Sequence, residues 1–160
     1  MPAAAATRRP AADPEPGTLA RPGAVHVCKL AIPGRAEHVQ HARQFTDLVL
    51  TAHSRDDEGT CGLLVSELVT NSLLHSDSGV DGGIVTITIT LSPGEILVAV
   101  TDDGGAGEPA LSPDAGGDDD AEHGRGLFLV QQLSGEWGHD RQGRQLTTWF
   151  TTRRTASPHD

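Results

Sequence analysis

The chain has 160 residues and a formal net charge of −10, from 12 Lys and Arg against 22 Asp and Glu. This length fits one domain with one hydrophobic core. The acidic balance argues against direct binding to nucleic acids and against docking on anionic membranes, because both need clustered Lys and Arg. The sequence also lacks an apolar run near the ~20 residues of a membrane span. We therefore expect a cytoplasmic protein.

Both ends of the chain predict flexible tails. Residues 1–22 are rich in Ala and Pro, residues 153–160 are similar, and neither segment has enough apolar side chains to order itself. Residues 23–152 between them read as one domain. The two cysteines, Cys28 and Cys61, are isolated, which indicates a reduced compartment without a disulfide framework.

The first half of the domain predicts one strand and two helices. Residues 25–32 read as a strand that ends at a Pro-Gly pair, and residues 35–52 read as a helix because apolar side chains recur at helical spacing. A second helix runs from about residue 54 to residue 75. Capping side chains and acid at residues 54–58 favour a helix start there.

The second half predicts two hairpins on either side of a long loop and a short helix. Residues 85–91 alternate Val, Ile and Leu with Thr, so they read as a strand with one buried face, paired with residues 96–101. Residues 103–123 are crowded with Gly, Asp and Pro and predict a lid. A helix over residues 126–133 and a hairpin of residues 137–140 and 146–152 follow.

This order of elements predicts an α+β fold. We expect a two-layer sandwich of a mixed, mainly antiparallel sheet with the helices on one face. The common nucleotide-binding folds do not apply, because no strand leads into a Gly-rich dinucleotide motif and no Gly-Lys-Ser/Thr sequence is present.

The second helix carries a polar row inside an apolar surface. At about 100° per residue, Leu and Val side chains cover both flanks, and Glu67, Asn71 and His75 form an i, i+4, i+8 row between them. One interpretation is a polar row whose partners are neighbouring backbone groups. The other is a cleft wall, in which Asn71 offers an oxygen to Mg²⁺ bound to triphosphate and Glu67 acts as a base.

Asp102 and the start of the third helix are two further candidates. Asp102 ends an apolar strand and opens an Asp-Asp-Gly-Gly loop, so it is either a turn residue or a carboxylate that accepts the amino group of adenine. Gly124-Arg125-Gly126-Leu127 begins a helix, where free N–H groups and the helix dipole favour a phosphate. Arg125 either adds a phosphate contact or is a solvated charge.

Together these motifs resemble an ATPase superfamily. Glu67-Leu-Val-Thr-Asn71-Ser-Leu-Leu-His75 resembles the N box shared by gyrase, heat-shock chaperones, histidine kinases and MutL. Val100-Thr-Asp102-Asp-Gly104 resembles the adenine-binding box, and His123-Gly-Arg-Gly126-Leu-Phe-Leu-Val resembles the glycine box after the lid. Within this superfamily the chain looks most like the short actinobacterial anti-sigma-factor serine kinases.

The resemblance implies a Bergerat-type fold that holds ATP and Mg²⁺ between helices and sheet. It implies phosphorylation of a Ser or Thr on an anti-anti-sigma partner, and sequestration of a sigma factor by a homodimer. By position, it implies that Asn71 is the magnesium ligand and Glu67 the general base. The nucleotide-contacting residues that it implies are Asp102, Gly104, Gly124, Arg125, Gly126, Leu127 and Thr147.

Two departures from the family pattern favour an alternative function. The adenine box usually runs Asp-x-Gly-x-Gly, but its last position here is Ala106, and the lid contains three consecutive Asp at residues 118–120, which would repel triphosphate. The alternative is a non-catalytic module, with or without bound ATP, that docks on a regulatory protein.

Overall fold

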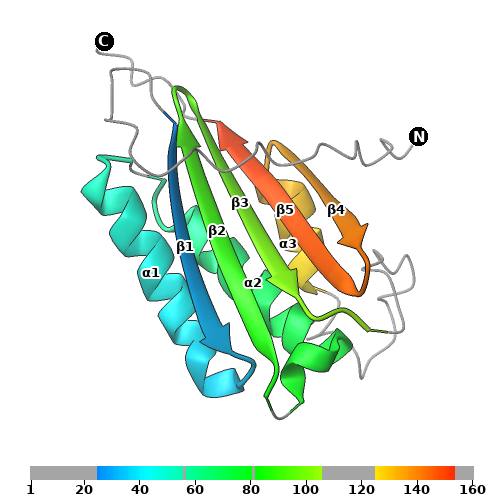
Figure 1. Cartoon of the computed structure of the whole chain (residues 1–160). Helices are drawn as coiled ribbons and strands as arrows, with labels where there is room; N and C mark the ends of the chain where they lie inside the picture. Colours follow the sequence, from blue (N-terminus) through cyan, green and yellow to red (C-terminus); the bar gives the residue numbers. More distant parts are fainter. Residues whose placement is uncertain (1–24, 56, 81, 106–124, 154–160) are drawn as a thin grey trace, which may run out of the picture.

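Five strands form one sheet in the order β1-β2-β3-β5-β4 (Figure 1). The structure is a computed structural model that describes residues 25–55, 57–80, 82–105 and 125–153. The expected tails lie outside these residues, apart from Arg153, and so does the expected lid from residue 106 onward. The strands are β1 (His26–Pro33), β2 (Ile84–Ser92), β3 (Glu95–Asp102), β4 (Glu136–Gln142) and β5 (Gln145–Arg153).

All pairings in this sheet are antiparallel. The mainly antiparallel sheet was therefore predicted correctly, and the described strands contain no parallel pair. Both hairpins form as the sequence predicts, with tight turns between β2 and β3 and between β4 and β5. The second turn contains Gly143 with a φ of 61°, a conformation that glycine adopts without strain.

The three α-helices of the described residues cover one face of the sheet (Figure 1). Within this layer α2 lies between α1 and α3, in agreement with the two-layer α+β sandwich that the sequence predicts. Short 3₁₀ turns precede α1 and follow α2. The helical elements are η1 (Ala36–His38), α1 (Val39–Ala52), α2 (Thr60–His75), η2 (Asp77–Gly79) and α3 (Arg125–Leu133).

The hydrophobic core lies between the helices and the sheet. In β2 the alternation places Val85, Ile87, Ile89 and Leu91 in this core at 1% exposure or less, while the Thr side chains face the other side. Burial of each such side chain contributes about 1.5–3 kcal/mol. Most of the helical contribution comes from α2, whose core residues are Cys61, Leu64, Val65, Leu68 and Val69.

Helix α2 begins six residues later than the sequence suggests. Ser54, Glu58 and Gly59 have φ angles of 55°, 57° and 79°, so the left-handed backbone ends α1 and delays α2 until Thr60. The expected capping side chain is nevertheless present. The Asp57 carboxylate accepts the N–H groups of Gly59 at 3.1 Å and of Cys61 at 2.6 Å.

None of the helices in the described part of the chain is long and apolar enough to cross a membrane. Cys28 and Cys61 are both free thiols, and Cys61 is fully buried in the core.

Candidate functional site

Asp102 is a buried carboxylate at the end of β3. It is 5% exposed, and it contacts α2 because the Ser72 hydroxyl forms a hydrogen bond with its side chain. The backbone N–H of Gly104 donates to Asp102 Oδ1 at 2.8 Å. Burial raises the pKa of Asp102 above its ordinary value, while the bonds from Ser72 and Gly104 partly offset this rise. A carboxylate placed in this way can accept a further hydrogen bond from a bound group.

Glu67 and Asn71 lie on one flank of α2, and both are half-buried. The opposite flank faces α1, since a Cβ on Gly62 would meet side-chain atoms of α1 within about 3 Å. Asn71 is nine residues after Gly62, which at about 100° per residue is half a turn away from α1. In the helix layer, α3 lies on the side of α2 that is away from α1 (Figure 1). Asn71 immediately precedes Ser72, the partner of Asp102.

The loop after β3 fits closely against two neighbouring segments. Gly104 has a φ of +77°, and a Cβ there would lie 1.6 Å from the carbonyl oxygen of Arg144 in the β4–β5 turn. A Cβ on Gly105 would lie 2.8 Å from the carbonyl oxygen of His75, the last residue of α2. Only glycine fits at position 104, and the loop is thereby held between the α2 end and the hairpin.

Thr147 does not join the other predicted site residues. The register pairs Thr147 with Thr101, and their hydroxyl groups are 2.8 Å apart. Paired residues share a face of the sheet, and successive residues of a strand alternate between faces. Because Asp102 directly follows Thr101, both threonines lie on the sheet face opposite Asp102. The threonine on the helix side is Thr148, which pairs with the core residue Val100 and is 8% exposed.

The predicted phosphate-binding helix start is described in part. Gly124 lies outside the described residues, while Arg125, Gly126 and Leu127 form the first turn of α3. Helix α3 packs against α2 and continues toward β4. The N-terminal end of α3 therefore belongs to the same layer as Glu67 and Asn71.

Three residues near Asp102 have no counterpart in the sequence prediction. Ser72 is buried on the sheet side of α2, and Thr148 lies on the helix face of β5, which depends on strand register. Arg141 follows from register as well, because Asp102 pairs with Leu146 and Leu146 pairs with Arg141, which places all three on the helix face. The Arg141 guanidinium lowers the pKa of Asp102, against the larger effect of burial.

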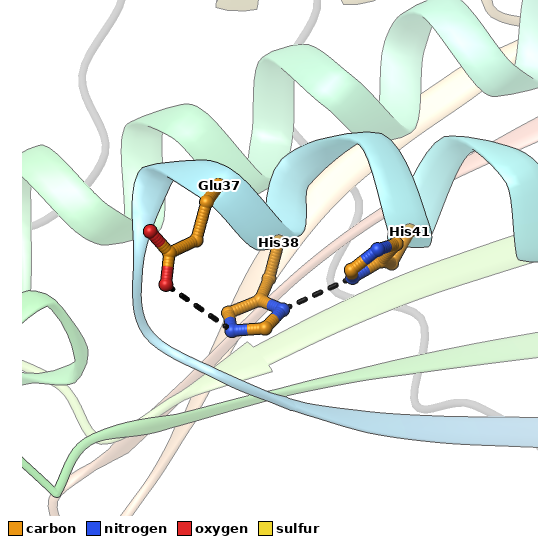
Figure 2. A network of polar contacts seen from close by, with 3 residues as sticks. All are labelled: Glu37, His38 and His41. Atoms are coloured by element: carbon orange, nitrogen blue, oxygen red, sulfur yellow. Dashed lines mark hydrogen bonds and ion pairs between the residues drawn. The ribbon is translucent and has the colours of Figure 1, made fainter.

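Two other features contain none of the predicted site residues. A surface hollow of about 500 Å³ is lined by the end of β1, by His38 and by residues 79–80 and 82–84. At the start of α1, Figure 2 shows His38 between Glu37 and His41, with the two Nδ1 atoms 3.0 Å apart. Among the residues that the structure describes, no group of three His, Cys, Asp or Glu side chains is arranged to hold a metal ion.

Comparison with known proteins gives one family match. The family described as histidine kinase-like ATPase domain matches residues 32–152. This range contains all the candidate residues above. No curated protein matches the chain at a significant level.

Two solved structures are similar to the chain. The RsbU and RsbW domains of a Mycobacterium tuberculosis protein match with a TM-score of 0.55 and 19% identity, over 79% of this chain and 32% of that one. This chain thus spans about a third of that protein's length, and the similarity supports the fold. The histidine kinase domain of a blue-light activated histidine kinase from Erythrobacter litoralis matches with a TM-score of 0.42 and 32% identity, over 59% of this chain and 43% of that one.

Proposed function

Because the chain belongs to the histidine kinase-like ATPase domain family, we propose that it is a Mg-ATP-binding regulator of the anti-sigma-factor serine/threonine kinase type. In this proposal it transfers a phosphoryl group to a Ser or Thr of an anti-anti-sigma partner, sequesters a sigma factor as a homodimer, or does both. The family implies ATP binding. The protein substrate, the partners and the role of each residue are parts of the proposal.

The observation that carries the proposal is the buried Asp102 beside α2. A 5% exposed carboxylate that already accepts bonds from Ser72 and Gly104 is costly to maintain without a further partner. The amino group of adenine is a suitable donor, whereas the O6 atom of guanine is an acceptor that the carboxylate would repel. We therefore assign Asp102 to recognition of adenine, with Thr148 as the threonine on the same side.

Asn71 and Glu67 are assigned to the phosphate end. Mg²⁺ prefers oxygen ligands and is commonly held by one or two protein groups together with substrate phosphates. The Asn71 side-chain oxygen fits this role. Glu67, one helical turn earlier on the same flank, would orient the incoming hydroxyl and accept its proton. The first turn of α3, with Arg125, Gly126 and Leu127, and the preceding Gly124 are assigned to the phosphates.

Calorimetric titration tests nucleotide binding directly. We expect Mg-ATP to bind and Mg-GTP to bind more weakly, and we expect Asn71→Ala to reduce the effect of Mg²⁺ on ATP affinity. Asp140→Asn is a matched control, because Asp140 pairs with Thr147 on the opposite sheet face. Absence of binding at millimolar Mg-ATP would favour the alternative, a docking module without nucleotide, which the acidic segment 118–120 and Ala106 motivate.

Phosphoryl transfer requires a second experiment. The purified protein is incubated with γ-labelled ATP and candidate anti-anti-sigma proteins, and label on the partner is measured. We expect Glu67→Gln to reduce the rate of transfer by about 10²–10⁴-fold while ATP affinity stays near the wild-type value. Glu136→Gln, which changes an exposed glutamate on β4, should transfer at the wild-type rate. Transfer that survives Glu67→Gln unchanged would remove Glu67 as the base.

A further inference from the structure

The segment between α2 and β2 is bonded to the loop that follows Asp102. Ser78 in η2 is fully buried, and its hydroxyl group has two backbone partners. It donates to the carbonyl oxygen of Ile84 at 2.8 Å and accepts the N–H of Asp103 at 2.8 Å. One side chain therefore joins the beginning of β2 to the residue immediately after Asp102.

Asp103 closes this connection from the other side. Its Oδ2 atom accepts the backbone N–H of Ile84 at 3.1 Å. Ser78, Ile84 and Asp103 thus form a closed ring of three hydrogen bonds, which we call the Ser78–Asp103 clasp. The half-buried Asp103 carboxylate is bonded to the start of β2, whereas the buried Asp102 carboxylate is bonded to Ser72 of α2, so the two neighbours have different partners.

Two further contacts extend the clasp to the end of α2. The N–H of Asp77 donates to the carbonyl oxygen of Gly104 at 2.7 Å. The N–H of Ser78 donates to Ser76 Oγ at 3.1 Å, and the Ser76 hydroxyl donates to the carbonyl oxygen of Ser72. The chain of bonds therefore begins at Ser72, which contacts Asp102, and returns to the residues directly after Asp102.

We propose that Ser78 and Asp103 are positioning residues for the nucleotide, because the clasp fixes the backbone after Asp102 relative to α2. This inference rests on the proposed binding of adenine at Asp102. Neither residue contacts the base. Each acts by holding the Asp102 carboxylate and the Gly104 N–H in one arrangement beside Ser72, so that the acceptor is ready before the nucleotide arrives. Loosening the clasp should therefore impair recognition of the base more than binding of the phosphates.

The two sides of the clasp can be opened separately. Asp103→Ala removes the acceptor for Ile84, whereas Asp103→Asn keeps an acceptor oxygen. Both substitutions remove the negative charge beside Asp102, so their comparison isolates the hydrogen bond from the charge. Ser78→Ala removes the partner of the Asp103 N–H and leaves the site without a steric clash. Asp140→Ala on the opposite sheet face is the control.

Amide hydrogen exchange of the nucleotide-free protein shows whether the clasp has opened. We expect the Ile84 amide to exchange at least about ten-fold faster in Asp103→Ala, and the Asp103 amide to do so in Ser78→Ala. Asp103→Asn and Asp140→Ala should exchange at nearly the wild-type rate at both amides. Unchanged exchange in both alanine variants would show that the clasp does not form, which overturns the inference.

Titration with Mg-ATP and Mg-GTP then measures positioning. We expect Asp103→Ala and Ser78→Ala to bind Mg-ATP about ten-fold more weakly and to lose most of the preference for ATP over GTP, with rescue by Asp103→Asn. A clasp that opens by exchange but leaves affinity and preference unchanged would overturn the inference while the proposed function stands. A wild-type protein that binds no nucleotide would overturn both.

Discussion

At the scale of single residues, Asp102 is subject to two opposing demands. Burial makes the carboxylate a selective acceptor, but it also removes water from it and raises its pKa. The folded protein therefore binds a proton at Asp102 more tightly than the unfolded chain does. Its contribution to stability is therefore present below the ordinary Asp pKa of about 3.9. That contribution is lost as pH rises through the raised value.

Asp102→Asn should separate the role of the carboxylate as an acceptor from the cost of burying its charge. We expect the variant to be as stable as the wild type or more stable at pH 7, because the amide is neutral, and to lose this advantage as pH falls below about 4. Mg-ATP affinity at pH 7 should fall by about 10- to 100-fold, since a hydrogen bond to a charged group contributes about 1.5–3 kcal/mol. Denaturant unfolding across this pH range and calorimetry check both parts. A stability loss that is the same at every pH would contradict the argument.

Gly104→Ala should be costly for two reasons that a second variant can separate. The left-handed backbone costs a non-glycine residue about 1–2 kcal/mol, and the new Cβ would overlap the Arg144 carbonyl oxygen. Gly143 has a φ of +61° but nothing within 4 Å of a Cβ. We therefore expect Gly143→Ala to show the backbone cost alone and Gly104→Ala to be clearly less stable, with weaker ATP binding. Equal unfolding free energies for the two variants would contradict the overlap.

At the scale of elements, the start of α2 depends on a side chain outside the helix. Asp57 accepts two N–H groups at this end, whereas the residue directly before the helix, Gly59, has no side chain to offer. The cap compensates for the left-handed residues that delay the helix. Asn71 is eleven residues beyond the first residue of α2, about 16 Å along the axis at 1.5 Å per residue.

Asp57→Ala should therefore lower stability without changing the site. We expect the free energy of unfolding to fall by about 1 kcal/mol, with partial recovery in Asp57→Asn, which keeps one acceptor oxygen. Mg-ATP affinity should remain within about two-fold of the wild-type value, because the coupling free energy between sites this far apart is usually below about 0.5 kcal/mol. Thermal unfolding and titration of the same samples give both quantities. A large loss of affinity would mean that the cap and the site are coupled through α2.

At the scale of the whole molecule, Cys61 reports on the core. It is fully buried, and its sulfur lies 3.7 Å from the Thr152 hydroxyl, so it joins α2 to β5. Burial, and then the neighbouring Asp57, raise the pKa of the Cys61 thiol far above its ordinary value. Since only the thiolate reacts with alkylating agents, Cys61 should be inert in the folded protein.

Alkylation should consequently measure global unfolding. In a Cys28→Ser background we expect Cys61 to react only through the unfolded state, so its rate should rise with denaturant in proportion to the unfolded fraction. Mass spectrometry after timed exposure to iodoacetamide gives the rate. Rapid reaction in the absence of denaturant would show that α2 separates locally from β5.

Most of the fold could be predicted because the sequence pattern is local and strong. The Thr alternation in β2 and the apolar sides of α2 each specify an element and its buried face. The delayed start of α2 could not be predicted, since left-handed φ angles at Ser54 and Glu58 arise from the path of the chain between two packed helices.

The candidate site was only partly accessible from sequence. The order of the motifs predicted Asn71 and Asp102 as site residues. In the structure Ser72, the residue after Asn71, forms a hydrogen bond with Asp102. The face on which each β5 threonine lies depends on register against β3, which the sequence alone does not give. In the structure the predicted Thr147 faces away from the helices, and Thr148 faces them. Arg141 and Ser78 lie 39 and 24 residues from Asp102 in sequence, and only the folded sheet brings them near it.

The contact between Gly104 and the β4–β5 turn gives the molecule a built-in optical reporter. The chain has two tryptophans and no tyrosine, and both tryptophans, Trp137 and Trp149, lie in this one hairpin. Trp137 packs against the core on the helix face of the sheet. Trp149 lies against Gly138 on the opposite face. Intrinsic fluorescence therefore arises from the hairpin alone, and its intensity should respond when a ligand displaces the loop that contains Gly104, without any added label.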